Sequence, residues 1–358
     1  MYLKDVEIEN FRNYTNQKIE LDKGINVFFG DNGEGKTNLL EAIFLCSMGK
    51  SFRTSKEAEM IRLACDSSQV TIHYQKQDRE GSIKAVLQEK KQFFSNGVRL
   101  KKVSELLGKI HTVLFTPDDM FILKGGPSQR RRFLDMMIGQ LRPNYVSVLN
   151  LYLRTMEQRN NYLKQIKLEK KQEDLLDIWD EKLAEYGEQI YSYRNYFMEK
   201  IKEKINLIHW NITKEKETLT IEYLSDSLRR DEIIKQLKRN RKIDILKGYT
   251  SCGIHRDDFR IFINDKQVNI YGSQGQHRSV ILSLKLAELS IVQEEIGEYP
   301  ILLLDDFMSE LDEKRRNQFL EKIEQVQVLI TCTDRLLLQK KDNTLFQVEK
   351  GSVHILNI

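Results

Sequence analysis

Several features that mark whole classes of protein are scarce in this chain. Only four prolines and four cysteines occur among its 358 residues, and the cysteines lie far apart with no C-x-x-C pair. Because disulfide scaffolds and zinc sites use closely spaced cysteines, the sequence argues against both and predicts reduced thiols. Low-complexity tracts, internal repeats and Gly/Ser-rich linkers are also lacking, so domain boundaries have to be inferred from changes of residue pattern.

Long apolar runs are lacking as well. No stretch approaches the ~18–20 apolar residues that a membrane-spanning helix needs. The first residues, from Met1 to Glu7, lack the apolar core of a signal peptide. The formal net charge is only +4, which permits a nucleic-acid partner without requiring one. We therefore expect a globular, cytoplasmic protein without a membrane partner.

The most informative motif begins at Gly30. An apolar, strand-like run over 25–29 is followed by the pattern G-x-x-x-x-G-K-T, and 38–45 is a good helix former. In this strand–loop–helix context the pattern predicts a P-loop, and a chance Gly-rich turn does not account for the flanks. Backbone N–H groups would surround a β-phosphate, while Lys36 reaches the β- and γ-phosphates and Thr37 ligates Mg²⁺. The predicted nucleotide-binding residues are Gly30, Asp31, Asn32, Gly33, Glu34, Gly35, Lys36, Thr37 and Asn38.

A second motif places two carboxylates after an aliphatic run. Residues 301–304 predict a strand buried on both faces, as in a parallel sheet, and Asp305 and Asp306 follow it. Asp305 would hold Mg²⁺ together with Thr37, and Asp306 would orient or polarise the attacking water. Because Asp306 has a shorter side chain than the glutamate of many related ATPases, slow turnover is expected. The alternative, a strand followed by an ordinary acidic turn, is less favoured with a P-loop upstream.

A third motif, over 271–278, precedes a long apolar helix that the pattern predicts from Val280 to Ile296. Ser273 at a helix N-cap and Gly275 would present a hydroxyl and backbone N–H groups to an anion. Since the P-loop already holds its own phosphate, this anion site best serves a nucleotide bound by a second subunit. On its own the S-x-G-Q pattern is weak, and its position shortly before the acid pair strengthens it.

This order of motifs resembles the ATP-binding-cassette ATPases. The resemblance implies that Ser273, Gly275 and Gln276 form a signature motif that closes on ATP held by the partner in a head-to-tail dimer. It matches residues 309–312 to the D-loop. It puts Thr331 or Thr333 at the switch position, and the candidate catalytic residues are then Lys36, Asp306 and Thr331.

The resemblance narrows to the RecF family, whose motifs cover nearly the whole chain. The residues that carry it are 11–14, 35–43, 50–53, 115–119, 127–135, 158–160, 255–258 and 273–276. It implies an α/β, ABC-type P-loop ATPase head with a mostly helical inserted lobe, no long coiled coil, and ATP and Mg²⁺ as cofactors. It also implies an ATP-dependent homodimer that binds double-stranded and gapped DNA and is a slow, DNA-stimulated ATPase. Such a dimer would work with RecO and RecR to promote RecA loading in DNA repair, replication and the SOS response. ATP is favoured over GTP by this resemblance alone.

Changes in the residue pattern predict three segments along the chain. Strand-like patterns surround one helix over 1–115, a helical and charged insertion occupies 116–254, and the α/β pattern returns over 255–358. Within the insertion, two apolar stripes at helical spacing predict a short antiparallel pair of helices joined near 170–173. The first stripe is Leu149, Leu153, Met156, Leu163 and Ile166, and the second runs from Leu183 to Ile208. Asn96-Gly97 predicts a hairpin turn.

Three sets of charged residues are candidates for binding, and the second and third sets keep two interpretations each. Arg12 and Arg53 are candidate nucleotide contacts by the family pattern alone. Residues 255–257 would support the nucleotide site or the dimer contact, or form a purely structural ion pair. A solvated helix face or internal ion pairs are as good an account of the arginine run as contact with DNA phosphates. The candidate DNA-binding residues of that run are Arg130, Arg131 and Arg132.

Two other functions stay open from the sequence. An SMC-type head that bridges DNA through long coiled coils would share these motifs, although the insertion is too short for a long arm. A P-loop phosphotransferase acting on a small molecule would not need Ser273, and it would have its acid pair much closer to Lys36.

Overall fold

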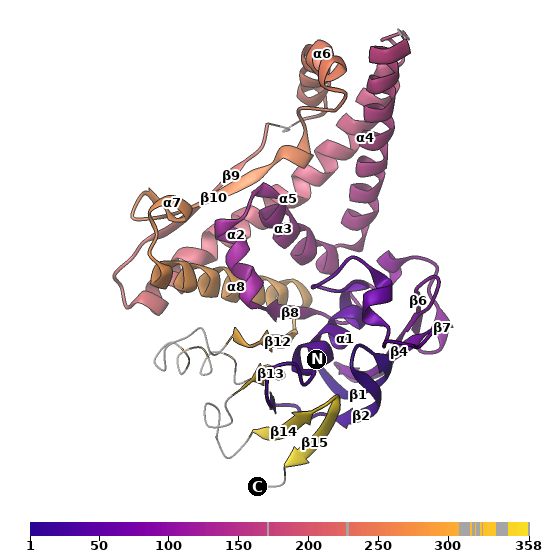
Figure 1. The fold of residues 1–358 in the computed structure, drawn as a ribbon. Coiled ribbons are helices and arrows are strands. Elements are labelled where there is room, and N and C mark those ends of the chain that lie inside the picture. Colours follow the sequence, from indigo (N-terminus) through magenta and orange to yellow (C-terminus); the bar gives the residue numbers. More distant parts are fainter. Residues whose placement is uncertain are drawn as a thin grey trace. The chain divides into compact units, whose positions relative to one another are not determined.

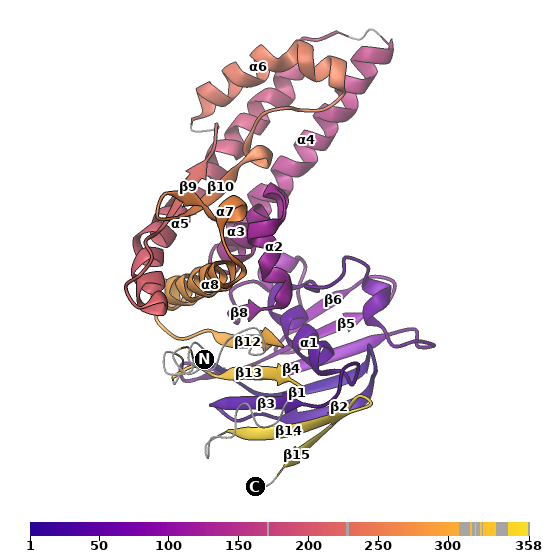
Figure 2. The ribbon, with the colours of Figure 1, turned by 60° about the vertical axis from the view of Figure 1, so that its left-hand side comes forward.

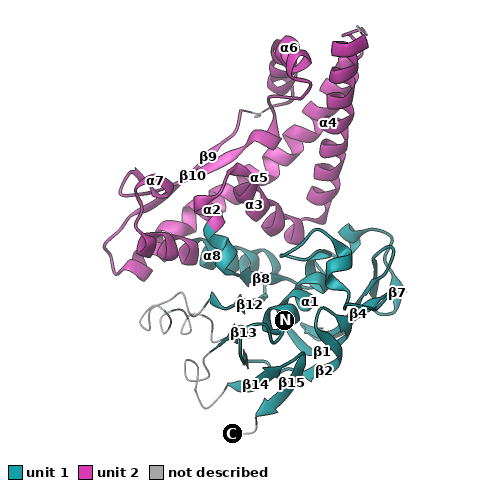
Figure 3. Cartoon of the chain, viewed as in Figure 1, with its two compact units in different colours: residues 1–120, 284–358 teal, residues 121–283 magenta. Residues whose placement is uncertain are grey.

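The computed structural model describes residues 1–169, 172–226, 229–307, 316, 319, 323, 325–333 and 343–356. By its contacts the chain divides into two compact units, residues 1–120 with 284–358 and residues 121–283 (Figure 3). The first boundary lies near the predicted one. The boundary predicted after residue 254 falls inside the second unit, because β10 (Asp258–Ile263) pairs along its whole length with β9 (Leu219–Leu224).

The first unit contains an antiparallel sheet with the strand order β2-β1-β4-β5-β6-β7. The strand-like patterns predicted within 1–115 are confirmed, and so is the hairpin between β6 and β7. Asn96 and Gly97 both have positive φ, 49° and 77°, as a two-residue hairpin of this twist requires. The strands are β1 (Tyr2–Phe11), β2 (Tyr14–Glu20), β4 (Ser68–Lys76), β5 (Arg79–Leu87), β6 (Gln92–Ser95) and β7 (Val98–Arg99).

The second sheet of this unit carries the P-loop and the acid pair. Its order is β15-β14-β3-β13-β12-β8, and all neighbours are parallel except β14 and β15. Every residue of β12 and β13 is buried, which confirms the strand expected over 301–304 and explains its aliphatic sequence. The elements are β3 (Ile25–Phe29), α1 (Lys36–Met48), β8 (Thr112–Phe115), β12 (Ile301–Asp305), β13 (Val328–Cys332), β14 (Thr344–Glu349) and β15 (Ser352–Leu356).

The second unit is mostly helical and includes a three-stranded sheet of order β11-β10-β9 (Figures 1 and 2). The expected pair of helices is present as α4 and α5, but with 27 and 38 residues the two are long, not short as predicted. α8 (Gln274–Ile296) begins in this unit and continues into the first. The other elements are α2 (Phe121–Lys124), α3 (Pro127–Leu141), α4 (Pro143–Glu169), α5 (Leu176–Thr213), α6 (Arg230–Lys247), β11 (Lys266–Gln267) and α7 (Val268–Tyr271).

The buried face of α4 differs from the predicted apolar stripe. Leu153 is 41% exposed, whereas Arg159 is fully buried on the face that packs inward. Its guanidinium donates to Asp180 on α5 (2.7 Å) and to Asp244 on α6 (2.8 Å), and both carboxylates are also fully buried. A charged side chain thus occupies a core position because two acids from other helices pair with it. Hydrophobic spacing alone could not indicate this.

No helix among the described residues combines the length and the apolar character required to cross a membrane.

Candidate functional site

The P-loop lies between β3 and α1 and wraps around its own lysine. Lys36 Nζ donates to the carbonyl oxygens of Gly30 (2.6 Å) and Asp31 (2.8 Å), and the side chain is buried. Gly35 has φ 117°, and a Cβ there would lie 2.6 Å from the Asn13 side-chain amide. Only glycine fits this turn into α1. The loop therefore encloses the ammonium group of Lys36, and the binding of phosphate by the loop stays a prediction.

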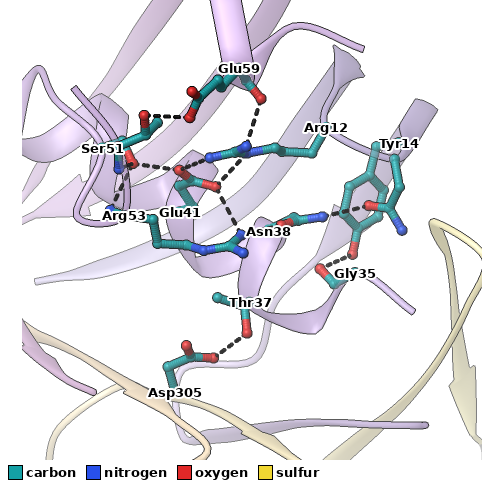
Figure 4. Close-up of polar contacts among 12 residues, drawn as sticks. Arg12, Tyr14, Gly35, Thr37, Asn38, Glu41, Ser51, Arg53, Glu59 and Asp305 are labelled. Carbon is teal, nitrogen blue, oxygen red and sulfur yellow. Dashed lines mark hydrogen bonds and ion pairs between the residues drawn. The ribbon is translucent and has the colours of Figure 1, made fainter. Parts of the chain in front are cut away.

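The turn between β1 and β2, the first residue of β2 and the β14–β15 turn fix the backbone of this loop. Asn13 Nδ2 donates to the Glu34 carbonyl (2.7 Å), as does the backbone N–H of Gly351 (3.0 Å). The buried Tyr14 hydroxyl donates to the Gly35 carbonyl (3.1 Å; Figure 4). These bonds fix the course of the loop backbone ahead of α1. Asn13 was not among the predicted site residues, because its contact with Glu34 depends on the pairing of β1 with β2.

The first acid of the pair directly meets the P-loop helix. Thr37 Oγ1 donates to Asp305 Oδ1 over 2.8 Å, joining two residues far apart in the sequence (Figure 4). Burial raises the pKa of Asp305, and the hydrogen bonds from Thr37 and Thr331 and the charge of Arg53 oppose that shift. A hydroxyl and a carboxylate at this spacing are hard oxygen donors of the kind that Mg²⁺ takes in phosphate sites.

The second acid is held in an unusual backbone conformation. Asp306 has φ 47°, and its N–H donates to Thr331 Oγ1 (2.9 Å). The same hydroxyl donates to Asp305 Oδ1 (2.8 Å), and Thr331 is almost fully buried. In this arrangement Thr331 orients the two acids, whereas the exposed Thr333 is the threonine whose side chain reaches the surface. The predicted D-loop, residues 309–312, lies outside the described residues.

Arg12 pairs with a buried glutamate on α1. Its Nε and Nη2 donate to the two carboxylate oxygens of Glu41 (2.9 and 2.7 Å), and Nη1 donates to the Glu59 carbonyl (2.6 Å). Glu41 is fully buried and also accepts from Ser51 and Arg53 (Figure 4). Each of the three guanidinium nitrogens of Arg12 thus donates to a protein oxygen, and a nucleotide contact at Arg12 stays a prediction.

Arg53 reaches the first turn of α1 from the opposite side. Its Nη1 donates to Asn38 Oδ1 (2.7 Å), and Asn38 Nδ2 donates to Asn13 Oδ1 (2.9 Å). Arg53 is 42% exposed. Sequence reasoning missed Glu41, although an acid within an otherwise apolar P-loop helix is a signal that a buried cation lies close by.

The predicted signature motif forms the N-terminus of α8. Ser273 N–H donates to Gln276 Oε1 (2.8 Å), and Gln276 N–H donates to Ser273 Oγ (3.2 Å). This reciprocal pair is a capping box, so the expected N-cap at Ser273 is present. Ser273 and Gly275 are exposed, and the preceding Ile270 and Tyr271 are 62% and 70% exposed. The polar groups of the motif and the two apolar side chains that precede it are thus exposed at the surface.

The arginine run on α3 is largely used within the second unit. Arg130 makes two hydrogen bonds to Asp258 (2.5 and 3.0 Å). Arg131 Nη1 donates to the Asp257 carbonyl (2.7 Å), and burial lowers its pKa. An internal ion pair therefore engages Arg130, and a hydrogen bond to a backbone carbonyl engages Arg131, which favours the interpretation as internal contacts for these two residues. Arg132 is the exposed member of the run.

Residues 255–257 also serve the second unit itself. Asp257 accepts from Arg194 (3.0 Å), the Tyr223 hydroxyl (2.6 Å) and Ser225 Oγ (2.7 Å). His255 Nδ1 lies 2.9 Å from the Tyr152 hydroxyl. These contacts correspond to the structural alternative that the sequence left open.

Acid is expected to destabilise the second unit through His255. Burial lowers its pKa from 6.5 to about 4. The unfolded chain therefore binds this proton at a higher pH than the folded chain, so the stabilisation is complete above pH 6.5 and is lost as the pH falls towards 4. Urea unfolding should show a loss of about 1–3 kcal/mol across that window beyond any loss in His255→Gln. The same pH dependence in both proteins would contradict this assignment.

Comparisons with known proteins show the family to which the chain is similar. The family model described as RecF/RecN/SMC N terminal domain matches residues 2–354. A "DNA replication and repair protein RecF" from Ruminiclostridium cellulolyticum is 40% identical over 370 residues, covering 99% of each chain. Its counterpart from Clostridium kluyveri is 41% identical over 363 residues, again covering 99% of each.

Solved structures give the same result. The "recombination mediator protein RecF-ATP in RecFOR pathway" superposes with a TM-score of 0.94 at 41% identity, covering 99% of this chain and 98% of that one. An SMC head bound to a domain of ScpA has a TM-score of 0.60 at 16% identity over 100% of this chain and 98% of that one, which shows a shared fold alone. With a family model that spans almost every residue and relatives of this similarity, the chain belongs to the RecF family of ABC-type ATPase heads.

Proposed function

We propose that this protein binds Mg²⁺-ATP at the P-loop, dimerises around it and hydrolyses it slowly while bound to DNA. The observation that carries the proposal is the 2.8 Å contact between Thr37 and Asp305. It brings the end of the P-loop and the acid-bearing strand to one point, where a metal-bound phosphate chain needs both. The relatives solved with ATP and with "ATPrS" support the choice of nucleotide.

The roles of the residues follow from their positions. Lys36 exchanges its two carbonyl contacts for the β- and γ-phosphate oxygens, and the loop N–H groups bind the β-phosphate. Thr37 and Asp305 would hold Mg²⁺, which neutralises developing charge on the phosphates when it is bound. Asp306 takes the proton of the attacking water, and Thr331 keeps both acids in place.

A dimer completes the site. Ser273 and Gly275 are exposed at the N-terminus of a 23-residue helix, where an anion is favoured. We assign them to the γ-phosphate of ATP held by the other subunit. A stabilising group supplied from outside the subunit can change the rate of phosphoryl transfer by ~10³–10⁵. A monomer therefore hydrolyses ATP slowly. Because each ATP contacts both subunits, ATP binding favours the dimer.

DNA is the proposed macromolecular partner. Relatives named for DNA replication and repair and a structure placed in the RecFOR pathway support a role in repair and replication. On this basis the dimer binds double-stranded or gapped DNA in the cytoplasm and acts with RecO and RecR to promote RecA loading. Among the three predicted arginines, Arg132 is the one retained as a candidate DNA contact.

Mg²⁺-ATP is expected to tighten binding to gapped duplex DNA by about 10-fold or more, because a dimer engages about twice as many phosphates as a monomer. Fluorescence anisotropy with a labelled gapped duplex measures the affinity, with ADP as the control. The logarithm of affinity should fall steeply with the logarithm of salt concentration. Equal affinities with ATP, ADP and no nucleotide would contradict the proposal.

A further inference from the structure

Glu217, which lies outside the signature motif, holds the side chain of Gln276, which belongs to it. Gln276 uses its Oε1 to accept from Ser273 N–H (2.8 Å), and its Nε2 donates to Glu217 Oε1 (2.9 Å). Both the oxygen and the nitrogen of the Gln276 amide are therefore occupied within the second unit. Gln276, which the sequence suggested as a nucleotide contact, connects the exposed motif to the segment between α5 and β9.

Glu217 is anchored in turn by a buried histidine. Its other carboxylate oxygen lies 3.1 Å from His209 Nε2, and His209 Nδ1 lies 2.9 Å from Ser283 Oγ on α8. His209 and Ser283 are fully buried, and the Glu217 side chain is 21% exposed. The end of α5 and the beginning of α8 lie side by side in both ribbon views (Figures 1 and 2). The hydrogen bonds thus start at the N-cap of α8 and return to the same helix more than two turns later.

The backbone on both sides of Glu217 is also fixed. Lys214 and Glu215 end α5 with positive φ, 57° and 64°. On the other side, Thr218 exchanges two hydrogen bonds of 3.0 Å with Asn264, at the turn that joins β10 to β11. The carboxylate of Glu217 therefore has little freedom to move away from Gln276.

We infer that Glu217, held by His209, is a positioning residue for the signature motif. By fixing the Gln276 amide it fixes the capping box, and the capping box sets the directions of the Ser273 hydroxyl and the Gly275 N–H. Those groups touch the nucleotide only in the partner's site, so the effect of Glu217 is exerted on the other subunit. This inference rests on the proposed ATP sandwich.

The test uses Glu217→Ala alone and mixed with Lys36→Ala. Alone, Glu217→Ala should bind a fluorescent ATP analogue as wild type does, because its own P-loop is intact. Its turnover should fall at least about 10-fold, since small errors of positioning are costly in catalysis. In a mixed dimer, the P-loop of Glu217→Ala meets the intact signature motif of Lys36→Ala. ATPase activity well above the sum of the two separate variants is therefore expected.

Two further variants make the outcome decisive. Glu222→Ala removes an exposed glutamate on β9 of the same unit and should leave turnover unchanged. Glu217→Gln keeps the side-chain size and one acceptor, so it should lose less activity than alanine and serves where the alanine variant does not fold. Wild-type turnover in both Glu217 variants, or no recovery on mixing, would overturn the inference. If the wild-type chain itself neither bound nor hydrolysed ATP, the proposed function would fail instead.

Discussion

Lys36→Ala is expected to lower the affinity for Mg²⁺-ATP by about 100-fold or more. Removing one partner of a buried, hydrogen-bonded charge pair costs about 2–5 kcal/mol, and each 1.4 kcal/mol is a factor of ten. Lys36 is buried at the centre of its loop, with Nζ 2.6 Å from the Gly30 carbonyl. Isothermal titration with a slowly hydrolysed ATP analogue measures the change.

The control for this variant is Lys90→Ala, which removes an exposed lysine of the first unit. Its affinity should equal that of wild type, because a distant surface charge is screened by salt. Comparable affinities of Lys36→Ala and Lys90→Ala would show that the nucleotide does not bind at the P-loop.

Asp306→Asn is expected to lower turnover by about 10²–10⁴-fold, the usual contribution of a general base. ATP affinity should stay close to the wild-type value, because Asp305 and Thr37 keep their contact. The substitution also suits the backbone. Asp306 has φ 47°, and asparagine is among the residues that best tolerate this left-handed region. Single-turnover hydrolysis of labelled ATP, measured beside binding, separates the two effects.

Two results would count against this role for Asp306. Turnover near the wild-type rate would mean that another group accepts the proton of water. A parallel loss of ATP affinity would mean that the side chain helps to bind the nucleotide or to hold the loop, and that its effect on turnover is secondary.

The parts that the sequence predicts well are those set by neighbouring residues. The strand, loop and helix around the P-loop are contiguous, and so is the capping box at Ser273. The aliphatic strand before Asp305 shows its buried position directly in its composition. The turn at Asn96-Gly97 depends on two residues with positive φ. In each case the local backbone preference and the tertiary environment agree.

The parts that the sequence predicts poorly depend on partners that are distant along the chain. Whether an arginine faces solvent or an acid is decided by those partners: Asp258 for Arg130 and Glu41 for Arg12. Glu217 meets Gln276 only because α8 passes the end of α5. The boundary between the two units that was predicted after residue 254 lies further along the chain, because β10 pairs with β9. The residues around position 254 carry no local signal for a pairing between strands that are distant in the sequence.

The central claim is that ATP joins two of these heads through the signature motif, and sedimentation velocity of Asp306→Asn tests it most directly. This variant should hold ATP without consuming it, so the sandwich accumulates. The account predicts a monomer without nucleotide and a dimer with Mg²⁺-ATP, with or without duplex DNA. A species that stays monomeric with Mg²⁺-ATP, even when duplex DNA is present, would contradict the account.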